Sequence, residues 1–319
     1  MDTEKKKKIV VLVMSCQDPF FKKEEMVCRS TWAKPIVNGE YDNIEYYSYV
    51  GGCERSYVDF HDRKIYCKAG DGIFETYQKT YEVFKLLDRF DIEYDYIFRT
   101  NTSTVVNVGL LDAFINSGLN DDCLYCGELY TIGLPCPLTN SIYARGNSVI
   151  LSRHLIDVIM DFDKHVVVPP TLFADDNIIG NTINVYHFLQ FTDYRDFLKS
   201  YGFAWYESYP KEHIMSQLSN GLSSWGNTDS SYEYLKNFIS IQIKSYVDRN
   251  TELKKMKKLS DIVSIKKDDY TEEIEFINKY MANPKVYVYN RKRNRHGYLN
   301  LYAEQKQEKE NTTGQSKVD

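Results

Sequence analysis

The sequence has no excess of positive charge. Its 40 lysine and arginine residues are outnumbered by 45 aspartate and glutamate residues, which gives a formal net charge of -5 at pH 7. General nucleic-acid binders normally carry a net basic domain or a dominant basic face. The balance therefore argues against that class, and any affinity for phosphate must come from a local site.

Long apolar runs are also missing. The run IVVLVM at residues 9 to 14 follows four lysines, but it is too short for a membrane-spanning helix and no small-residue cleavage site follows it. We interpret it as the first buried strand. With no other apolar run near the length of a membrane span, we expect a soluble, cytoplasmic protein without a transmembrane segment.

Several motifs that would point elsewhere are absent. The seven cysteines include one CxxC, Cys123 and Cys126, with no second pair. Because a structural zinc site needs about four ligands, we expect reduced thiols that flank a short strand. Neither G-x-G-x-x-G nor GxxxxGK[ST] occurs, which weakens the case for another nucleotide-binding α/β enzyme.

The residues that are present alternate between two patterns, with 43% apolar residues in total. Strands are predicted at residues 9–15, 44–50, 94–100, 123–129 and 285–291, and helices at 20–33, 73–90, 108–117, 152–162, 174–183, 231–257 and 271–282. This alternation predicts an α/β fold with a mostly parallel central sheet flanked by helices, whose ligands bind at the carboxyl ends of the strands.

The predicted organisation is one catalytic domain with additions at both ends. We expect a charged arm at 1–8, the domain at 9–260, a C-terminal extension packed on it at 261–305, and a disordered polar tail at 306–319. Residues 203 to 230, rich in Ser, Asn, Gly and Trp, predict a long surface loop near a ligand.

Four landmarks occur in a recognisable order. They are Arg29-Ser-Thr-Trp32, the strand YDYIFRTNTSTVVN at 94–107, IYARGNSVILSRHLI at 142–156, and Asp175-Asp176-Asn-Ile-Ile-Gly180. In order and spacing they resemble the β-1,3-galactosyltransferase and Fringe type of glycosyltransferase. The resemblance covers roughly residues 9 to 190 and implies a GT-A-type, Rossmann-like fold.

The chain departs from this family at one point. Where the family carries an Asp-rich triplet after the strand, the chain has Asn101, Thr102 and Ser103. The carboxylates of the family hold a divalent cation, Mn or Mg, and such cations need anionic oxygen ligands. Three alternatives stay open: a metal held elsewhere, a metal-independent site, or lost catalysis. The three side chains can hydrogen-bond a ribose or donor sugar, or simply close the strand as a turn.

Without a metal, cationic side chains must stabilise the diphosphate of a nucleotide-sugar donor. FISIQIKSYVDR at 238–249 supplies Lys244 and Arg249, and it resembles the basic segment that meets donor phosphates in enzymes of this fold. The alternative without a function is that Lys244 and Arg249 lie at a solvated C-terminal helix end, where positive charges complement the helix dipole. Arg29 and Arg99 are the alternative donor-binding cations, and Arg99, at a strand end, is the better placed of the two.

Asp175 and Asp176 are the strongest catalytic candidates. In an inverting transfer a carboxylate takes the proton of the attacking acceptor hydroxyl, and one of two close carboxylates can have its pKa raised by the other. By resemblance Asp176 is the base and Asp175 its neighbour. An N-cap role would explain one of the two aspartates.

Aromatic residues in the predicted loop suggest an acceptor platform. Trp205, Trp225 and Tyr206, with Tyr209, could stack on an acceptor sugar, although core packing explains each of them singly.

Two functional hypotheses follow from these residues. The first is a hexosyltransferase that moves a sugar from a UDP- or GDP-linked donor to a glycan hydroxyl with inversion. We assign it no definite metal cofactor, because the usual ligands of Mn or Mg are absent. The second is a catalytically inactive relative that keeps the fold and binds a sugar or nucleotide. Loss of the acidic triplet favours the second, and retention of the acidic pair favours the first.

Overall fold

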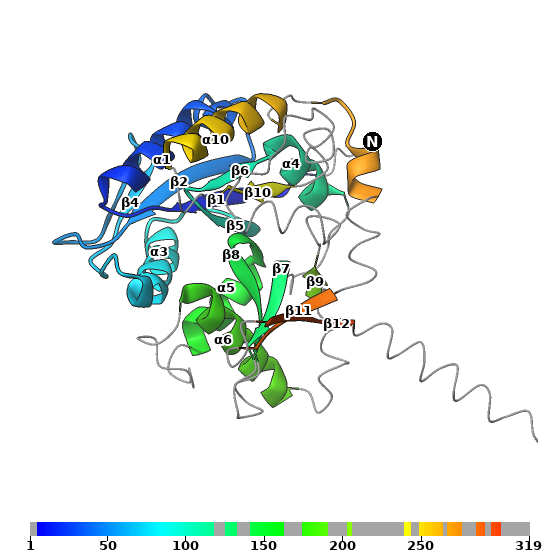
Figure 1. Cartoon of the computed structure of the whole chain (residues 1–319). Helices are drawn as coiled ribbons and strands as arrows, with labels where there is room; N and C mark the ends of the chain where they lie inside the picture. The colour runs from blue at the N-terminus through cyan, green and yellow to red at the C-terminus, as the bar shows by residue number, and fades with distance from the viewer. Residues whose placement is uncertain are drawn as a thin grey trace, which may run out of the picture.

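A ten-stranded mixed sheet runs through the protein in the computed structural model (Figure 1). The structure describes residues 5–117, 125–132, 141–162, 174–190, 203–205, 239–243, 249–263, 267–275, 285–290 and 295–300.

The strands follow one another in the order β12-β11-β7-β8-β5-β1-β2-β4-β3, and β9 pairs with β7. Their bounds are β1 Ile9–Met14, β2 Ile44–Val50, β3 Tyr57–Asp59, β4 Lys64–Tyr66, β5 Tyr96–Asn101, β7 Tyr125–Ile132, β8 Ser141–Ser152, β9 Phe203–Trp205, β11 Lys285–Asn290 and β12 Arg295–Asn300. The neighbours β5, β1, β2 and β4 are parallel, whereas β8 runs antiparallel between β5 and β7. β6 (Thr104–Val106) and β10 (Ser240–Gln242) form a separate antiparallel pair.

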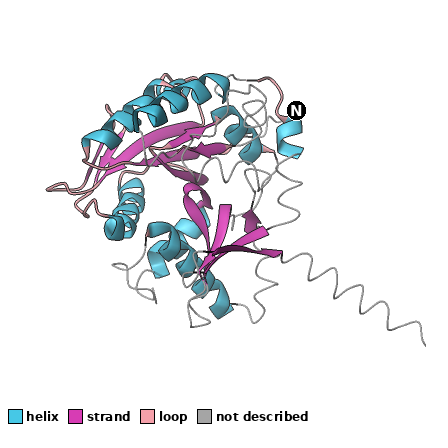
Figure 2. Cartoon of the chain, viewed as in Figure 1, coloured by secondary structure: helices cyan, strands magenta, loops and turns pink. Residues whose placement is uncertain are grey.

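Helices cover both faces of the sheet (Figure 2). Their bounds are α1 Pro19–Ser30, α2 Lys34–Val37, α3 Thr76–Arg89, α4 Val108–Asn116, α5 Arg153–Phe162, α6 Asp175–Gln190 and α10 Arg249–Val263, and η1 (Ile73–Glu75) is a 3-10 turn before α3. One apolar core joins the sheet to α1, α2, α4 and α10, and a second core joins it to α3, α5 and α6. The prediction of a mostly parallel α/β sheet flanked by helices is therefore confirmed.

The alternation of side chains along β1 explains how one strand serves both cores. Ile9, Val11 and Val13 point into the first core, and Val10 and Leu12 point into the second. Successive side chains of a strand face opposite sides of its sheet. A strand with two covered faces must therefore be apolar throughout, as IVVLVM is.

Local capping fixes where two helices begin. Asp18 caps α1 by accepting a hydrogen bond from the Phe20 amide at 2.7 Å, and Pro19 occupies the first helical position. Asn107 caps α4 through the Leu110 amide at 3.1 Å. α1 begins just beyond β1, so its amino end lies at the carboxyl edge of the sheet.

The predicted helix at 231–257 is wrong in its middle. Ser240–Gln242 is the strand β10, and the helix α10 begins only at Arg249. Ile239, Ile241 and Ile243 alternate with polar residues and are all buried, so the segment has the period of a strand. The other strands and helices predicted along the described residues occur with shifted ends.

The C-terminal part of the sheet adds two strands. β11, from the predicted extension, pairs in parallel with β7, and β12 pairs antiparallel with β11. The exact domain boundaries stay a prediction, and residues 306–319 lie outside the described residues. Among the residues that the structure describes, no helix is both long and apolar enough to cross a membrane.

Candidate active site

The two candidate aspartates open α6 beneath the carboxyl edge of the sheet. The Asp175 amide donates to the Thr76 hydroxyl of α3 at 3.0 Å, which ties the start of one helix to the start of the other. The same face of the sheet carries Tyr49 at the end of β2 and Arg99 near the end of β5. Ligands of open α/β sheets bind at this edge.

The Asp175 carboxylate is occupied by contacts within the protein. Its Oδ2 lies 2.6 Å from Nη2 of Arg99, and it accepts a hydrogen bond from the Thr80 hydroxyl at 3.1 Å. Both partners of the ion pair are almost completely buried. Removing one partner of such a buried ion pair destabilises the folded protein, because the other charge is left uncompensated. Asp175 is thus a structural residue in this arrangement.

Burial and charge act on this pair in opposite directions. Burial raises the pKa of the Asp175 carboxyl, and the Arg99 charge opposes that rise. Burial also works against the charged form of Arg99, yet Asp175 and Tyr49 together raise the pKa of its guanidinium above the ordinary value. Arg99 consequently stays protonated at neutral pH.

Asp176 is only half-buried and makes different contacts. Its Oδ2 accepts from the Gly146 amide at 3.1 Å, and its Oδ1 accepts from the Asn177 amide at 2.8 Å and from Asn177 Nδ2 at 2.6 Å. An ionised carboxylate offers about four acceptor positions. Among the residues that the structure describes, these contacts occupy three of them, which leaves one for a hydroxyl proton.

Residues 101 to 103 lie at the same carboxyl edge. Asn101 follows Arg99 by two positions on β5, so the two side chains share a face, and it pairs in register with Met14 of β1. Its Oδ1 accepts from the hydroxyls of Ser103 at 2.9 Å and Thr104 at 2.8 Å. Thr102 is buried on the other face and donates to Glu24 Oε2 at 2.5 Å.

These residues do not fit a divalent cation. Asn101, Thr102 and Ser103 offer no carboxylate, and their hydrogen bonds turn them toward one another and toward Glu24. Among the described residues, one group of side chains has the spacing of metal ligands: Asp59, His61 and Asp62, around the turn between β3 and β4. That group is largely exposed and its members do not contact Asp176, so no catalytic step is assigned to a metal.

The predicted cations fall in different places. Arg249 is the first residue of α10, not a late residue of a helix, and its guanidinium lies over the rings of Phe20 at 4.4 Å and Phe21 at 5.6 Å. Those rings belong to the start of α1, so Arg249 lies at the carboxyl edge. Ile243 donates its amide to the Ser103 carbonyl at 2.7 Å, which brings the chain past residue 103 immediately before Lys244. Lys244 itself lies outside the described residues.

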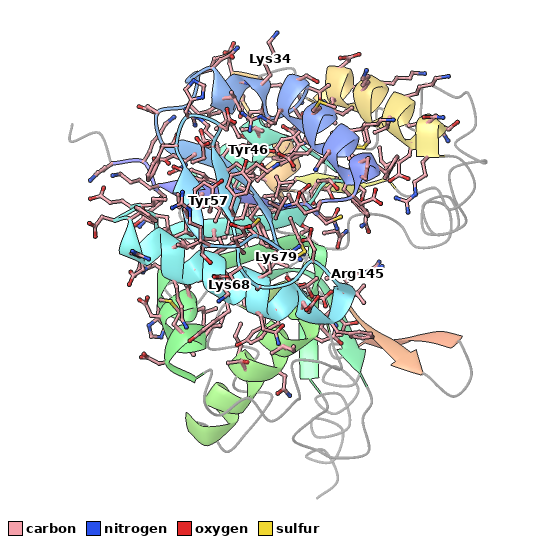
Figure 3. All side chains as sticks on the ribbon, turned by 90° about the vertical axis from the view of Figure 1, so that its left-hand side faces the viewer. Lys34, Tyr46, Tyr57, Lys68, Lys79 and Arg145 are labelled. Carbon is pink, nitrogen blue, oxygen red and sulfur yellow. The ribbon has the colours of Figure 1, made fainter. Side chains whose placement is uncertain are left out.

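Arg29 lies away from this group. It donates to the Asp62 carbonyl and its guanidinium is 5.8 Å from the Tyr46 ring centroid. Tyr46 belongs to the core beneath α1, on one face of the sheet. The helix α3, which carries Lys79, covers the other face, and Figure 3 labels both residues. Because the sheet separates Arg29 from Asp175, the structure does not bring this predicted donor-binding residue to the aspartates.

The predicted acceptor residues are mostly outside the described part of the chain. Trp205 ends β9, where its backbone pairs in register with Gly127 of β7. Tyr206, Tyr209 and Trp225 fall on residues that the structure does not describe, so the acceptor platform stays a prediction.

Sequence reasoning missed a buried lysine at this edge. Lys79 Nζ donates to Asp71 Oδ1 at 2.7 Å and to the Ser15 carbonyl at 2.9 Å, and Asp71 also accepts from the Gly51 amide at 2.8 Å. These contacts join the loops that follow β1 and β2 to the loop before α3. The available signal was a lysine close to the apolar stripe of a predicted helix, which requires a buried anionic partner.

No family model matches the chain, and no curated protein matches it as a relative.

Proposed function

We propose that the protein is an inverting glycosyltransferase of the GT-A type that uses a nucleotide-sugar donor, and that Asp176 is its general base. One observation carries the proposal: two adjacent aspartates at the carboxyl edge have opposite environments. Asp175 is buried and paired with Arg99, whereas Asp176 is half-buried and has one acceptor position that no described residue occupies. Such a division supports one structural carboxylate and one reactive carboxylate.

The proposed step needs no metal. The acceptor hydroxyl oxygen attacks the anomeric carbon, and its proton passes to the Asp176 carboxylate. A new carbon–oxygen bond forms while the bond from the anomeric carbon to the diphosphate oxygen breaks, so the nucleoside diphosphate leaves with the electron pair. Arg249, which lies over the start of α1, and Lys244, which follows Ile243 in sequence, are the proposed cations for this charge.

A second candidate is a non-catalytic sugar- or nucleotide-binding relative. The internal hydrogen bonds of Asn101 favour it, because a loop that satisfies its own polar groups has fewer left for a donor or metal. Both candidate proteins would bind a sugar or nucleotide ligand, but only the glycosyltransferase would transfer the sugar to an acceptor.

Replacing Asp176 tests the proposal directly. Asp176→Asn should lower transfer by roughly 10²- to 10⁴-fold, because the amide cannot take a proton, while donor affinity stays near that of the wild type. Transfer is measured by release of nucleoside diphosphate from a panel of nucleotide sugars, and affinity by calorimetry.

Asp161→Asn is the matched control, since Asp161 is exposed on α5, and it should keep full activity. Normal turnover by Asp176→Asn would refute the assignment. A wild-type protein that binds nucleotide sugars and never transfers them would favour the non-catalytic relative.

A further inference from the structure

The backbone of Gly146 lies between the two candidate carboxylates, with its carbonyl and its amide in two consecutive peptide planes. Its carbonyl oxygen accepts a hydrogen bond from Arg99 Nη1, and its amide donates to Asp176 Oδ2 at 3.1 Å. Arg99 in turn pairs with Asp175 at 2.6 Å. A continuous set of polar contacts therefore runs from Asp175 through Arg99 and Gly146 to Asp176.

Gly146 is required here for its lack of a side chain. A Cβ at this position would collide with the guanidinium of Arg99. A larger residue therefore has to displace either Arg99, which would break its contact with the Gly146 carbonyl, or the strand β8, which would move the amide that faces Asp176.

Arg99 cannot easily give way. Its Nε donates to the Tyr49 hydroxyl at 3.3 Å, Nη2 lies 3.3 Å from the Met14 sulfur, and the side chain is 5% exposed. Contacts from β1, β2, β8 and α6 thus hold the guanidinium on several sides. The guanidinium therefore holds the peptide plane that contains the Gly146 carbonyl, and the Thr100 hydroxyl holds the next carbonyl, that of Asn147, at 2.8 Å. The Gly146 amide belongs to the preceding peptide plane, which is joined to this one through the Gly146 Cα, so a held carbonyl limits the positions that the amide can take.

We propose that Arg99 and Gly146 are positioning residues that orient the Asp176 carboxylate for proton transfer. The catalytic part of this inference rests on the proposed function, since it takes Asp176 as the base. Neither residue contacts the donor diphosphate in this scheme, which gives Arg99 a different role from the donor-binding one predicted from sequence. Precise orientation of a catalytic group is worth roughly 10²-fold in rate for a displacement near 1 Å.

The decisive variant is Arg99→Lys, which keeps a positive charge beside Asp175 but cannot hold the planar set of contacts. We expect kcat to fall roughly 10- to 100-fold, with the donor KM within about twofold of the wild-type value. Gly146→Ala should act in the same direction through the opposite end of the contact. Circular dichroism identifies any variant that fails to fold.

A nuclear magnetic resonance titration supplies a readout independent of turnover. Because the Gly146 amide donates to Asp176, its proton shift should follow the ionisation of the Asp176 carboxyl, observed by carbon-13 labelling. In Arg99→Lys this response should shrink or disappear. Arg153→Lys is the matched control, since Arg153 also makes a 2.6 Å ion pair, with Asp88, but on the surface.

The outcomes separate the two hypotheses. If the Gly146 amide shift of Arg99→Lys still follows the ionisation of Asp176, the positioning role is overturned, whether or not activity falls. Any loss of activity would then not be transmitted through the Gly146 backbone. A lost response together with a lower kcat supports the role. A wild-type protein without transferase activity refutes the proposed function, while the titration still decides whether Arg99 orients Asp176.

Discussion

At the scale of single residues, the most unusual feature beside the Asp pair is a second pair of buried carboxyls. Glu24 of α1 and Glu252 of α10 are both almost inaccessible, and burial, followed by the contact with Glu252, raises the pKa of Glu24 to about 8. Thr102 and the nearby Arg249 act in the opposite direction. The pair lies directly behind the loop that carries Asn101.

This pair should make stability depend on pH. The folded-state pKa of Glu24 lies above the ordinary value of 4.5, so the folded protein keeps a proton that the unfolded chain has already lost. The contribution of Glu24 to the free energy of unfolding is therefore largest below about pH 4.5. It falls by at most about 1.4 kcal/mol for each pH unit as the pH rises toward 8, and it changes no further above that pH.

Glu24→Gln should remove much of this dependence, because the amide imitates the protonated carboxyl. We expect the variant to be more stable than the wild type at pH 8 and similar to it near pH 5, measured by urea unfolding. Glu25→Gln is the contrasting control: Glu25 is paired with Lys64 at 2.8 Å, so its loss should destabilise the protein at both pH values. Equal curves for Glu24→Gln and wild type would contradict this account.

At the scale of secondary-structure elements, the packing of residues 267–275 on α4 depends on one glycine. A Cβ at Gly109 would meet the hydroxyl of Tyr270, whose side chain is buried in the first core. Tyr270 also accepts a hydrogen bond from the Lys267 amide at 3.1 Å. The segment can therefore lie against α4 only because the helix has no side chain at that point.

Gly109→Ala should consequently destabilise the protein, although the same change in an exposed helix interior stabilises by about 1 kcal/mol. We expect a loss of roughly 1–3 kcal/mol from overpacking, measured by chemical denaturation. The double variant Gly109→Ala with Tyr270→Phe removes the clashing hydroxyl and should recover part of the loss. A stabilised single variant would show that Tyr270 is not held against the helix.

At the scale of the whole molecule, charge and site oppose each other. A net charge of -5 repels an anionic donor in general, so affinity for a nucleoside diphosphate has to come from cations gathered at the carboxyl edge. Arg249 lies there, and Lys244 directly follows the residue that binds Ser103. Because such attraction is screened by ions, donor binding should weaken as salt is added.

Lys244→Ala and Arg249→Ala should each weaken nucleoside diphosphate binding, by roughly 5- to 30-fold for the loss of about 1–2 kcal/mol. Calorimetric titration with manganese and with chelator measures the affinity, and we expect binding to survive the chelator. Arg29→Ala is the matched control, since the sheet separates Arg29 from the aspartates. Unchanged affinity in the two variants would remove them from the site, and binding that needs manganese would contradict a metal-independent mechanism.

The local pattern of the sequence determined most of the fold. The apolar run of β1 and the periodicity of α3, α4 and α5 depend on contacts between near neighbours, so they can be derived without coordinates. The mostly parallel sheet follows from the same information, whereas the catalytic role of Asp175 and Asp176 was taken from a family resemblance and stays a prediction. The strand β10 was missed because its three alternating isoleucines were assigned to a helix.

Only the tertiary structure decided where each candidate residue lies and which groups it contacts. Asp175 and Asp176 are neighbours in sequence, yet one is buried against Arg99 and the other remains half-buried, because α6 begins with its first residue turned toward the sheet. Arg29 and Arg99 were alternative donor-binding cations in sequence, with Arg99 the better placed, and the structure puts them on opposite faces of the sheet. The contacts of Gly146 with Arg99 and Asp176 join residues far apart along the chain, and the place of Lys79 beside an apolar stripe signalled its burial without naming its partners. Partners brought together by long-range packing leave no local pattern from which they could be derived.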